Sequence, residues 1–175
     1  MNTGPQERRF RDLMSSFPSG VAIVTAMHPD GTPRGMTCSS VTSVTLLPPT
    51  LLVCLRIGSG TLEAVSVQGG FAVNLLHDGA RHAAEVFSSA APDRFRHVSW
   101  RTSAAGIPRL DKDTFAVAEC QVSDLLTVGD KAVVFGEVRH VEQTEGAPLV
   151  YVHRQFSSWP LAQLVCEDFS CVPMN

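Results

Sequence analysis

The sequence predicts a mainly β protein, a closed antiparallel β-barrel with a few helices around it. Several short runs of β-branched residues indicate strands, and most of them follow one another through tight turns, as in antiparallel hairpins. No Gly-x-Gly-x-x-Gly motif follows the first strand, which argues against the doubly wound sheet of the common dehydrogenases. A chain of 175 residues is long enough to form one domain with its own core.

The predicted strands are short apolar runs bounded by turn residues. They cover residues 21–25, 35–41, 51–56, 71–76, 115–126, 132–143 and 148–152. Asp30 and Gly31 form a dipeptide typical of tight reversals, so the first two strands are expected to pair as a hairpin. Gly129 and Asp130 separate the two longest strands in the same way, whereas residues 90–109 are expected to form a long, loop-rich connection.

Short helices are predicted where apolar residues recur at helical spacing. They cover an N-terminal stretch with Phe10, Leu13, Met14 and Phe17 on one face, then residues 59–68 and residues 79–88. Gly69 and Gly70 are typical of a helix end. Because no periodic pattern follows Trp159, residues 1–160 are expected to form the domain and residues 161–175 a C-terminal tail.

Composition excludes several classes of protein. The 14 basic residues are balanced by 17 acidic ones and form no stripe, so a nucleic acid partner is not expected. No apolar run approaches the ~20 residues of a membrane span, and the N-terminus lacks the apolar core of a secretory signal, so we expect a cytoplasmic protein without membrane association. The five cysteines form no Cys-x-x-Cys pair or zinc-ligand spacing, so neither a disulfide framework nor a metal site is expected.

No motif of nucleophilic catalysis, metalloprotease chemistry or phosphate-binding loops is present. Instead, residues 37–45 read TCSSVTSVT, a cluster of hydroxyls. Such a run has two interpretations. It consists of ordinary strand and turn residues, or it forms a polar binding site for a phosphate or for a flat heteroaromatic ring. Arg56, followed by Ser59 and Thr61 at a predicted helix start, adds a cation and backbone N–H donors that attract phosphate, although a simple serine cap would give the same pattern.

An ordered set of short motifs resembles the flavin reductase-like family of FMN-binding split barrels. The motifs run from FPSGVAIVT (17–25) and GMTCSS (35–40) through SVT (43–45), PPTL (48–51) and FAVNLL (71–76) to GD (129–130), GEV (136–138) and PLVY (148–151). The resemblance implies a split barrel and a homodimer. It also implies hydride transfer from NADH or NADPH to FMN, with FAD possible, and delivery of reduced flavin to a partner monooxygenase.

By this resemblance, a set of residues is expected to bind the flavin. They are Pro18, Ser19 and Gly20 beside the ring; Thr37, Cys38, Ser39, Ser40, Ser43, Val44 and Thr45 along the ring and ribityl chain; Cys54, Leu55, Arg56, Ser59 and Thr61 toward the ribityl chain and phosphate; and Asn74 and Phe87 near the flavin. The absence of a catalytic triad beside these hydroxyls fits this role, because the hydride passes between the two cofactors and the protein has only to bind and orient them.

One position departs from the resemblance. The family commonly has Gly-Asp-His where this chain has Gly129, Asp130 and Lys131. Lysine keeps a donor and adds a charge but does not stack as an imidazole does. Lys131 is thus a candidate for the nicotinamide and flavin site, and replacing it with alanine is expected to raise the NAD(P)H requirement more than the flavin requirement.

Two other functions fit the same sequence. One is a flavin-binding split barrel that holds FMN tightly and is not a reductase, which the lysine at position 131 favours. The other is a barrel whose flavin site has become an interaction surface, against which the hydroxyl cluster argues.

Overall fold

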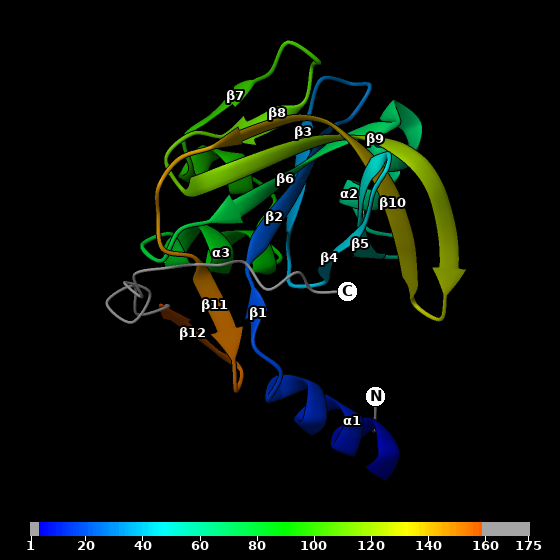
Figure 1. Ribbon diagram of the computed structural model, residues 1–175, viewed down its shortest axis with the longest axis vertical. Coiled ribbons are helices and arrows are strands. Elements are labelled where there is room, and N and C mark those ends of the chain that lie inside the picture. Colours follow the sequence, from blue (N-terminus) through cyan, green and yellow to red (C-terminus); the bar gives the residue numbers. More distant parts are fainter. Residues whose placement is uncertain (1–3, 159–175) are drawn as a thin grey trace.

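A curled, seven-stranded antiparallel sheet forms the body of the protein (Figure 1). The computed structural model describes residues 4–158, so the predicted tail, residues 161–175, lies outside the described residues. The helices are α1 (Pro5–Ser15), α2 (Gly60–Gln68) and α3 (Arg81–Ser88), with a short 3₁₀ helix η1 (Arg94–His97). The strands are β1 (Ser19–Gly20), β2 (Ala22–Met27), β3 (Pro33–Cys38), β4 (Val41–Leu46), β5 (Pro49–Arg56), β6 (Gly70–Leu76), β7 (Trp100–Thr102), β8 (Pro108–Leu110), β9 (Thr114–Val128), β10 (Lys131–Gln143), β11 (Leu149–Val152) and β12 (Gln155–Ser158).

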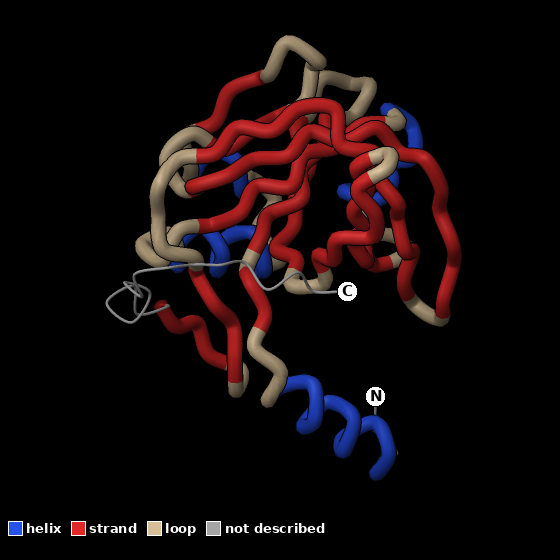
Figure 2. The backbone as a smooth tube through the Cα atoms, viewed as in Figure 1, coloured by secondary structure: helices blue, strands red, loops and turns tan. Residues whose placement is uncertain are grey.

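The large sheet has the strand order β3-β2-β6-β9-β10-β5-β4, and every neighbouring pair is antiparallel. It curls round as Figure 2 shows, but no ladder in the described part joins its edge strands β3 and β4. The connection between these two strands is bonded to β5, because Ser40 accepts a hydrogen bond from the Cys54 N–H at 3.2 Å. The mainly β class with flanking helices is confirmed, and so is the split barrel that the family resemblance implies, since the described sheet curls round without a ladder between its two edge strands.

Several strands were not predicted from the sequence. β4 begins at Val41, where the expected strand over 35–41 ends, because the chain breaks and turns at Ser39 and Ser40. The connection expected to be loop-rich contains η1 and the β7–β8 hairpin. A separate small sheet, β1-β11-β12, lies below the barrel in Figure 1, and of its strands only β11 was predicted, as residues 148–152. The missed strands β1, β7, β8 and β12 have two to four residues each, which is too short for an alternation of apolar and polar residues to be recognised.

The core has two main parts, divided by the sheet. Strand β2 is buried on both faces: Val24 points into the barrel interior, and Ile23 packs beneath α3 with Phe87. Helix α2 closes the barrel interior with the buried side chains of Ala64 and Val65. The predicted end of α2 is confirmed, because Gly69 adopts a left-handed φ of 71° there.

Helix α1 projects away from the barrel (Figure 1). Its predicted apolar face is exposed, with 64% of Phe10 and 67% of Leu13 accessible, and Phe17 beyond its end is 66% exposed. An amphipathic helix normally buries this face, so the stripe is available to a partner.

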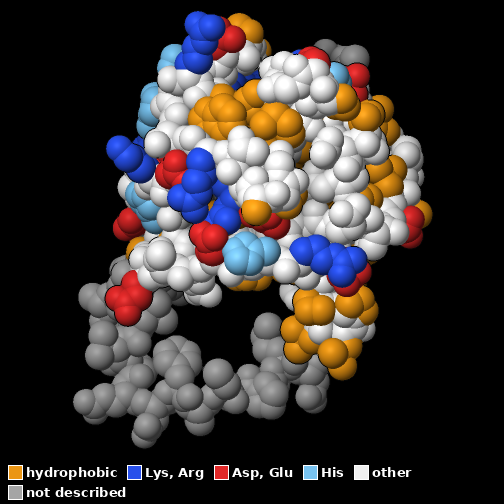
Figure 3. All heavy atoms as spheres, turned by 90° about the horizontal axis from the view of Figure 1, so that it is seen from above, with side chains coloured by type: hydrophobic (Ala, Val, Ile, Leu, Met, Phe, Trp, Pro, Cys, Tyr) orange, Lys and Arg blue, Asp and Glu red, His pale blue; other side chains and the backbone are white. Residues whose placement is uncertain are grey.

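Figure 3 shows the distribution of charged side chains on one face of the molecule. On the face seen from above, basic and acidic side chains lie next to one another rather than forming a basic stripe (Figure 3). Between residues 4 and 158, no helix is both long enough and apolar enough to cross a membrane.

Candidate functional site

Two adjoining cavities lie beside β3 and α3, and the N-terminus of α2 lines one of them. The larger, of about 640 Å³, is called here the cationic cavity, since Arg34, Arg56, Arg94 and Lys131 line it. The second, of about 580 Å³, is called the aromatic cavity and is lined by residues of β3, α3 and the β11–β12 hairpin. Both volumes lie in the range of cofactor sites. Thr37 and Ser88, of which Thr37 was predicted to bind flavin, line both cavities.

The N-terminus of α2 opens onto the cationic cavity. Ser59 caps the helix by accepting a hydrogen bond from the Leu62 N–H at 3.2 Å. The first turn of a helix leaves further N–H groups without intrahelical partners, and here they belong to Gly60 and Thr61, which line the cavity. The Arg34 side chain lies over this turn, with its Cδ 3.6 Å from the position that a Cβ on Gly60 would occupy.

The charge in this cavity is strongly one-sided. Among the described residues that line it, none is acidic. Arg56 on β5 and Lys131 on β10 occupy directly opposite positions in the ladder, and like charges placed so destabilise a sheet. Asp130, at 3.7 Å from Lys131, is the acid paired with that lysine. Such an arrangement, next to a helix N-terminus, is suited to a bound anion.

Arg94 forms part of the opposite wall. Its guanidinium donates to the Gly35 carbonyl at 2.8 Å and to the Ser89 carbonyl, while its Nε is buried without a partner among the described residues. Burial lowers the pKa of this arginine. The contacts with two carbonyls fix the loop after α3 against β3 and thereby set the width of the cavity.

The structure brings some of the predicted flavin-binding residues to the cavities. Those that line the cationic cavity are Thr37, Arg56, Ser59, Thr61, Phe87 and Lys131, and Ser39 lines the aromatic cavity. They come from β3, β5, α2, α3 and β10 and from residues that flank β3 and α2, so their convergence is a property of the fold rather than of local sequence.

Other predicted residues line neither cavity. Ser19 and Gly20 pair with β11, Ser43, Val44 and Thr45 lie exposed on β4, and Ser40 and Cys54 hydrogen-bond one another. Cys38 and Leu55 belong to the barrel core.

Asn74 is fully buried and has a structural role. Its amide nitrogen donates to the Ile23 carbonyl at 2.9 Å and to the Thr25 hydroxyl at 3.0 Å, and its oxygen accepts from the Leu110 N–H at 2.9 Å. These bonds tie β6 to β2 and β8, and the predicted proximity of Asn74 to a flavin stays a prediction.

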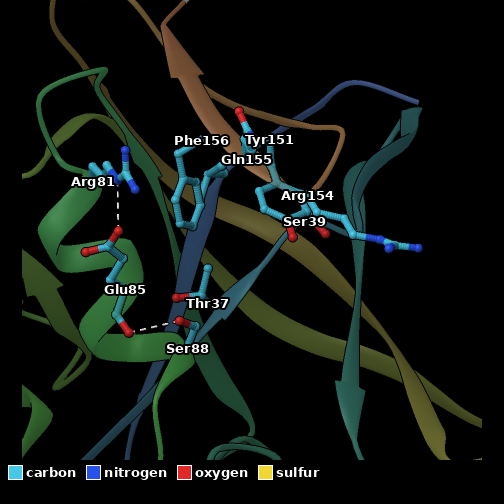
Figure 4. Close-up of a pocket in the computed structure, with 10 residues that line it drawn as sticks. Thr37, Ser39, Arg81, Glu85, Ser88, Tyr151, Arg154, Gln155 and Phe156 are labelled. Carbon is cyan, nitrogen blue, oxygen red and sulfur yellow. Dashed lines mark hydrogen bonds and ion pairs between the residues drawn. The ribbon is translucent and has the colours of Figure 1, made fainter. Parts of the chain in front are cut away.

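The aromatic cavity contains residues that sequence reasoning missed. Tyr151 and Phe156 have ring centroids 5.2 Å apart at an interplanar angle of 57°. Figure 4 places this pair between Arg81 of α3 and Arg154 of the β11–β12 turn. The PLVY motif, which ends at Tyr151, was the available signal, but nothing in the sequence indicated that the hairpin folds back toward α3.

Comparison with known proteins identifies the family. Residues 14–160 match the family model described as "Flavin reductase like domain", which is more than half of the chain. The chain belongs to the flavin reductase-like family.

Family relatives cover most of this chain. It is 54% identical over 150 residues to a protein of Lentzea aerocolonigenes named "Flavin reductase (NADPH)", across 85% of this chain and 88% of the relative. It is 40% identical over 157 residues to "Flavin reductase (NADH)" of Kitasatospora aureofaciens, across 88% and 82% of the two chains. The crystal structure of nitrilotriacetate monooxygenase component B from Mycobacterium thermoresistibile superposes with a TM-score of 0.87 at 30% identity, covering 95% of this chain and 94% of the other.

Proposed function

We propose that the chain is an NAD(P)H:flavin oxidoreductase that reduces FMN and delivers the reduced flavin to a separate monooxygenase. The observation that carries the proposal is the cationic cavity, where four basic side chains and the N-terminus of α2 surround space of cofactor size. Membership of the flavin reductase-like family and the two relatives named as flavin reductases support the reaction. The monooxygenase component among the similar structures supports the partner.

The residues of the cavity fit a flavin phosphate. Arg34 and Arg56 would supply charge-assisted hydrogen bonds, and the N–H groups of Gly60 and Thr61 would complete the contacts with the phosphate oxygens. FMN and FAD share the ring and inner phosphate, so FAD is proposed as a second flavin substrate. The unfavourable juxtaposition of Arg56 and Lys131 is offset once a dianion lies between them.

The chain's own task is to orient two rings and to exclude water. The bound flavin supplies the hydride acceptor, and the nicotinamide coenzyme supplies the donor. Thr37, at the junction of the cavities, uses its hydroxyl proton in a 2.7 Å bond to the Ala84 carbonyl, so its oxygen can only accept a further hydrogen bond from a ligand. Phe87 and Ser88 of α3 complete the apolar and polar wall opposite β3.

We also propose that two copies of the chain associate. The exposed apolar side chains of Phe10, Leu13 and Phe17 support this, because monomers rarely leave aromatic and aliphatic side chains so accessible together. Light scattering after size-exclusion chromatography should give twice the chain mass, and the double substitution F10S/L13S should shift the mass toward that of one chain. Cys38, Cys54 and Cys120 are free thiols, which is in keeping with the cytoplasm as the proposed compartment.

Steady-state oxidation of NADH and NADPH by the purified protein tests the reductase function. Assays with FMN, FAD or no added flavin should show turnover only when flavin is added, with the higher kcat/KM for FMN. The K131A variant should raise the KM for the coenzyme more than the KM for FMN. Failure of the wild-type protein to oxidise either coenzyme, while still binding FMN, would overturn the proposal.

A flavoprotein that holds FMN tightly and is not a reductase is the second candidate. The lysine at position 131, where the family commonly has histidine, is the observation that favours it. Stoichiometric flavin that copurifies and never exchanges would distinguish this candidate from a reductase of diffusible flavin.

A further inference from the structure

We propose that the aromatic cavity binds the 2′-phosphorylated adenosine of NADPH, and that Arg154 selects NADPH over NADH. The inference rests on the proposed reductase function and names the coenzyme and the residue that recognises it. Four features of the cavity carry it: the aromatic pair, the two arginines, the strained turn and the junction with the cationic cavity.

The aromatic pair suits a purine base. Tyr151 and Phe156 are half-buried, so each ring is held by packing while part of its surface faces the cavity. Adenine stacks on such rings without a requirement for a specific hydrogen-bond pattern. Gln155 and Ser39, which also line the cavity, can bond the base edge and ribose as both donors and acceptors.

The two arginines differ in where the acidic side chain that pairs with each of them lies. Arg81 is paired with Glu85 at 2.8 Å, and both line the cavity, so the positive charge of Arg81 is neutralised within the cavity itself. The acid paired with Arg154 is Asp12 of α1, which does not line the cavity. Both members of this second pair are more than half exposed, and exposed ion pairs are weak, so a phosphate dianion can take the place of the Asp12 carboxylate. The planar guanidinium fork matches two phosphate oxygens at once.

Backbone strain fixes Arg154 at this place. His153 and Arg154 form the two-residue turn between β11 and β12, with left-handed φ values of 50° and 62°. Asn and Gly are the usual residues of such a turn, and an arginine there is uncommon. The His153 N–H donates to the Ser15 carbonyl at 2.5 Å, which anchors the turn to the end of α1. Strain of this kind persists where the position of the side chain matters, and here the side chain borders the cavity.

The position of the cavity agrees with a coenzyme that must reach the flavin. Because Thr37 and Ser88 line both cavities, a molecule in the aromatic cavity can extend toward one in the cationic cavity. The α3 helix, which carries Arg81 and Ser88, spans the two. In this arrangement Arg34 and Arg56 bind the phosphate of the flavin, and Arg154 binds the 2′-phosphate of the coenzyme.

Coenzyme kinetics of Arg154→Asn test the selection. Asparagine tolerates the left-handed turn, so the charge is removed with the backbone conformation kept. The ratio of kcat/KM for NADPH to that for NADH should fall about 10-fold, as expected for loss of a charge-assisted hydrogen bond. The matched control, Arg139→Asn, removes an exposed arginine that pairs with Glu137 and lines neither cavity, and should leave the ratio as it is.

Each kinetic outcome has a defined meaning. An unchanged ratio in a folded R154N protein overturns the inference while leaving the reductase function intact, because turnover by the wild-type protein establishes that function separately. Absence of turnover in the wild type would refute the proposed function instead. Should R154N fail to fold, Arg154→Gly, which relieves the left-handed strain, replaces it.

A binding measurement without flavin or turnover provides the second test. The chain has a single tyrosine, so incorporation of fluorotyrosine gives one fluorine NMR signal, from Tyr151. Adenosine 2′,5′-bisphosphate should shift this signal at about 10-fold lower concentration than adenosine 5′-monophosphate, and R154N should abolish the difference. Equal titrations by the two nucleotides, or no shift with either, would contradict the inference.

Discussion

Replacing Arg56 with glutamine should have opposite effects on the stability of the free protein and on its affinity for FMN. Arg56 lies opposite Lys131 in the β5–β10 ladder, and both line the cationic cavity. An arginine whose role is packing or a salt bridge stabilises the protein without ligand. An arginine whose role is to bind an anion, and which lies beside another cation, destabilises the protein until the anion is bound. Glutamine retains the length of the side chain and one donor but removes the repulsion.

The two magnitudes follow from these contacts. A like-charge pair directly across a ladder costs a few tenths of a kcal/mol, so R56Q should stabilise the free protein by about 0.5 kcal/mol, which raises Tm by about 1–2 °C for a domain of this size. Salt should diminish this gain, because Arg56 is exposed. A charged hydrogen bond to phosphate contributes about 1.5 kcal/mol, so the Kd for FMN should rise about 10-fold.

Thermal unfolding and flavin titration measure both effects. Riboflavin lacks the phosphate and serves as the probe for ring binding alone, so its Kd should be the same in R56Q and in the wild type. Arg139→Gln is the matched control, since it removes the positive charge of an exposed arginine that does not line the cavity. Equal weakening of FMN and riboflavin, or a fall in Tm of the free protein, would refute the assignment of Arg56 to the phosphate.

Three further predictions concern the fold. Arg109→Met should lower the free energy of unfolding in urea by about 3 kcal/mol, because Glu119, bonded to Arg109 at 3.1 Å and almost completely buried, would lose its counter-charge; the second change E119Q should restore part of the loss, and an additive double variant would argue against the pair. Hydrogen bonding by Arg109 holds the pKa of Glu142 at about 2, so the ionised carboxylate stabilises the fold at neutral pH. This stabilisation is lost as the pH falls from about 4.5 toward 2. The Glu142→Gln variant should therefore show a smaller change of its urea midpoint with pH over that range than the wild type. Gly136→Ala should cost about 1–3 kcal/mol, since its Cβ would lie 2.5 Å from Phe71 Cζ, and a Tm equal to that of the wild type would show that the core can adjust.

The sequence predicted the main strands and helices because each carries a strong local signal. The apolar run of β2, the Asp30-Gly31 reversal and the stop at Gly69 were all readable from neighbouring residues. β1, β7, β8 and β12 were not, because strands this short are specified by their partners and not by their own pattern. The exposure of the α1 stripe was equally hidden, since amphipathicity reports that a face is apolar but not what covers it.

The candidate site was predictable only in part. Arg56, Ser59 and Thr61 could be found because a cation and a helix start lie close together in the sequence. Arg34 and Arg94 could not, since nothing in the neighbouring sequence distinguishes them from other arginines and only the placement of β3 and η1 brings them to the cavity. Residues placed by tertiary structure alone leave no trace in local sequence.

Release of reduced flavin tests most directly whether the chain supplies a separate monooxygenase. The protein, FMN and a limiting amount of NADPH are mixed without oxygen, and the mixture is passed through a membrane that retains the chain. A reductase that supplies a separate monooxygenase should leave most of the reduced flavin in the filtrate. Reduced flavin retained in stoichiometric amount with the protein would contradict the proposed reductase function and support a flavoprotein with tightly held FMN.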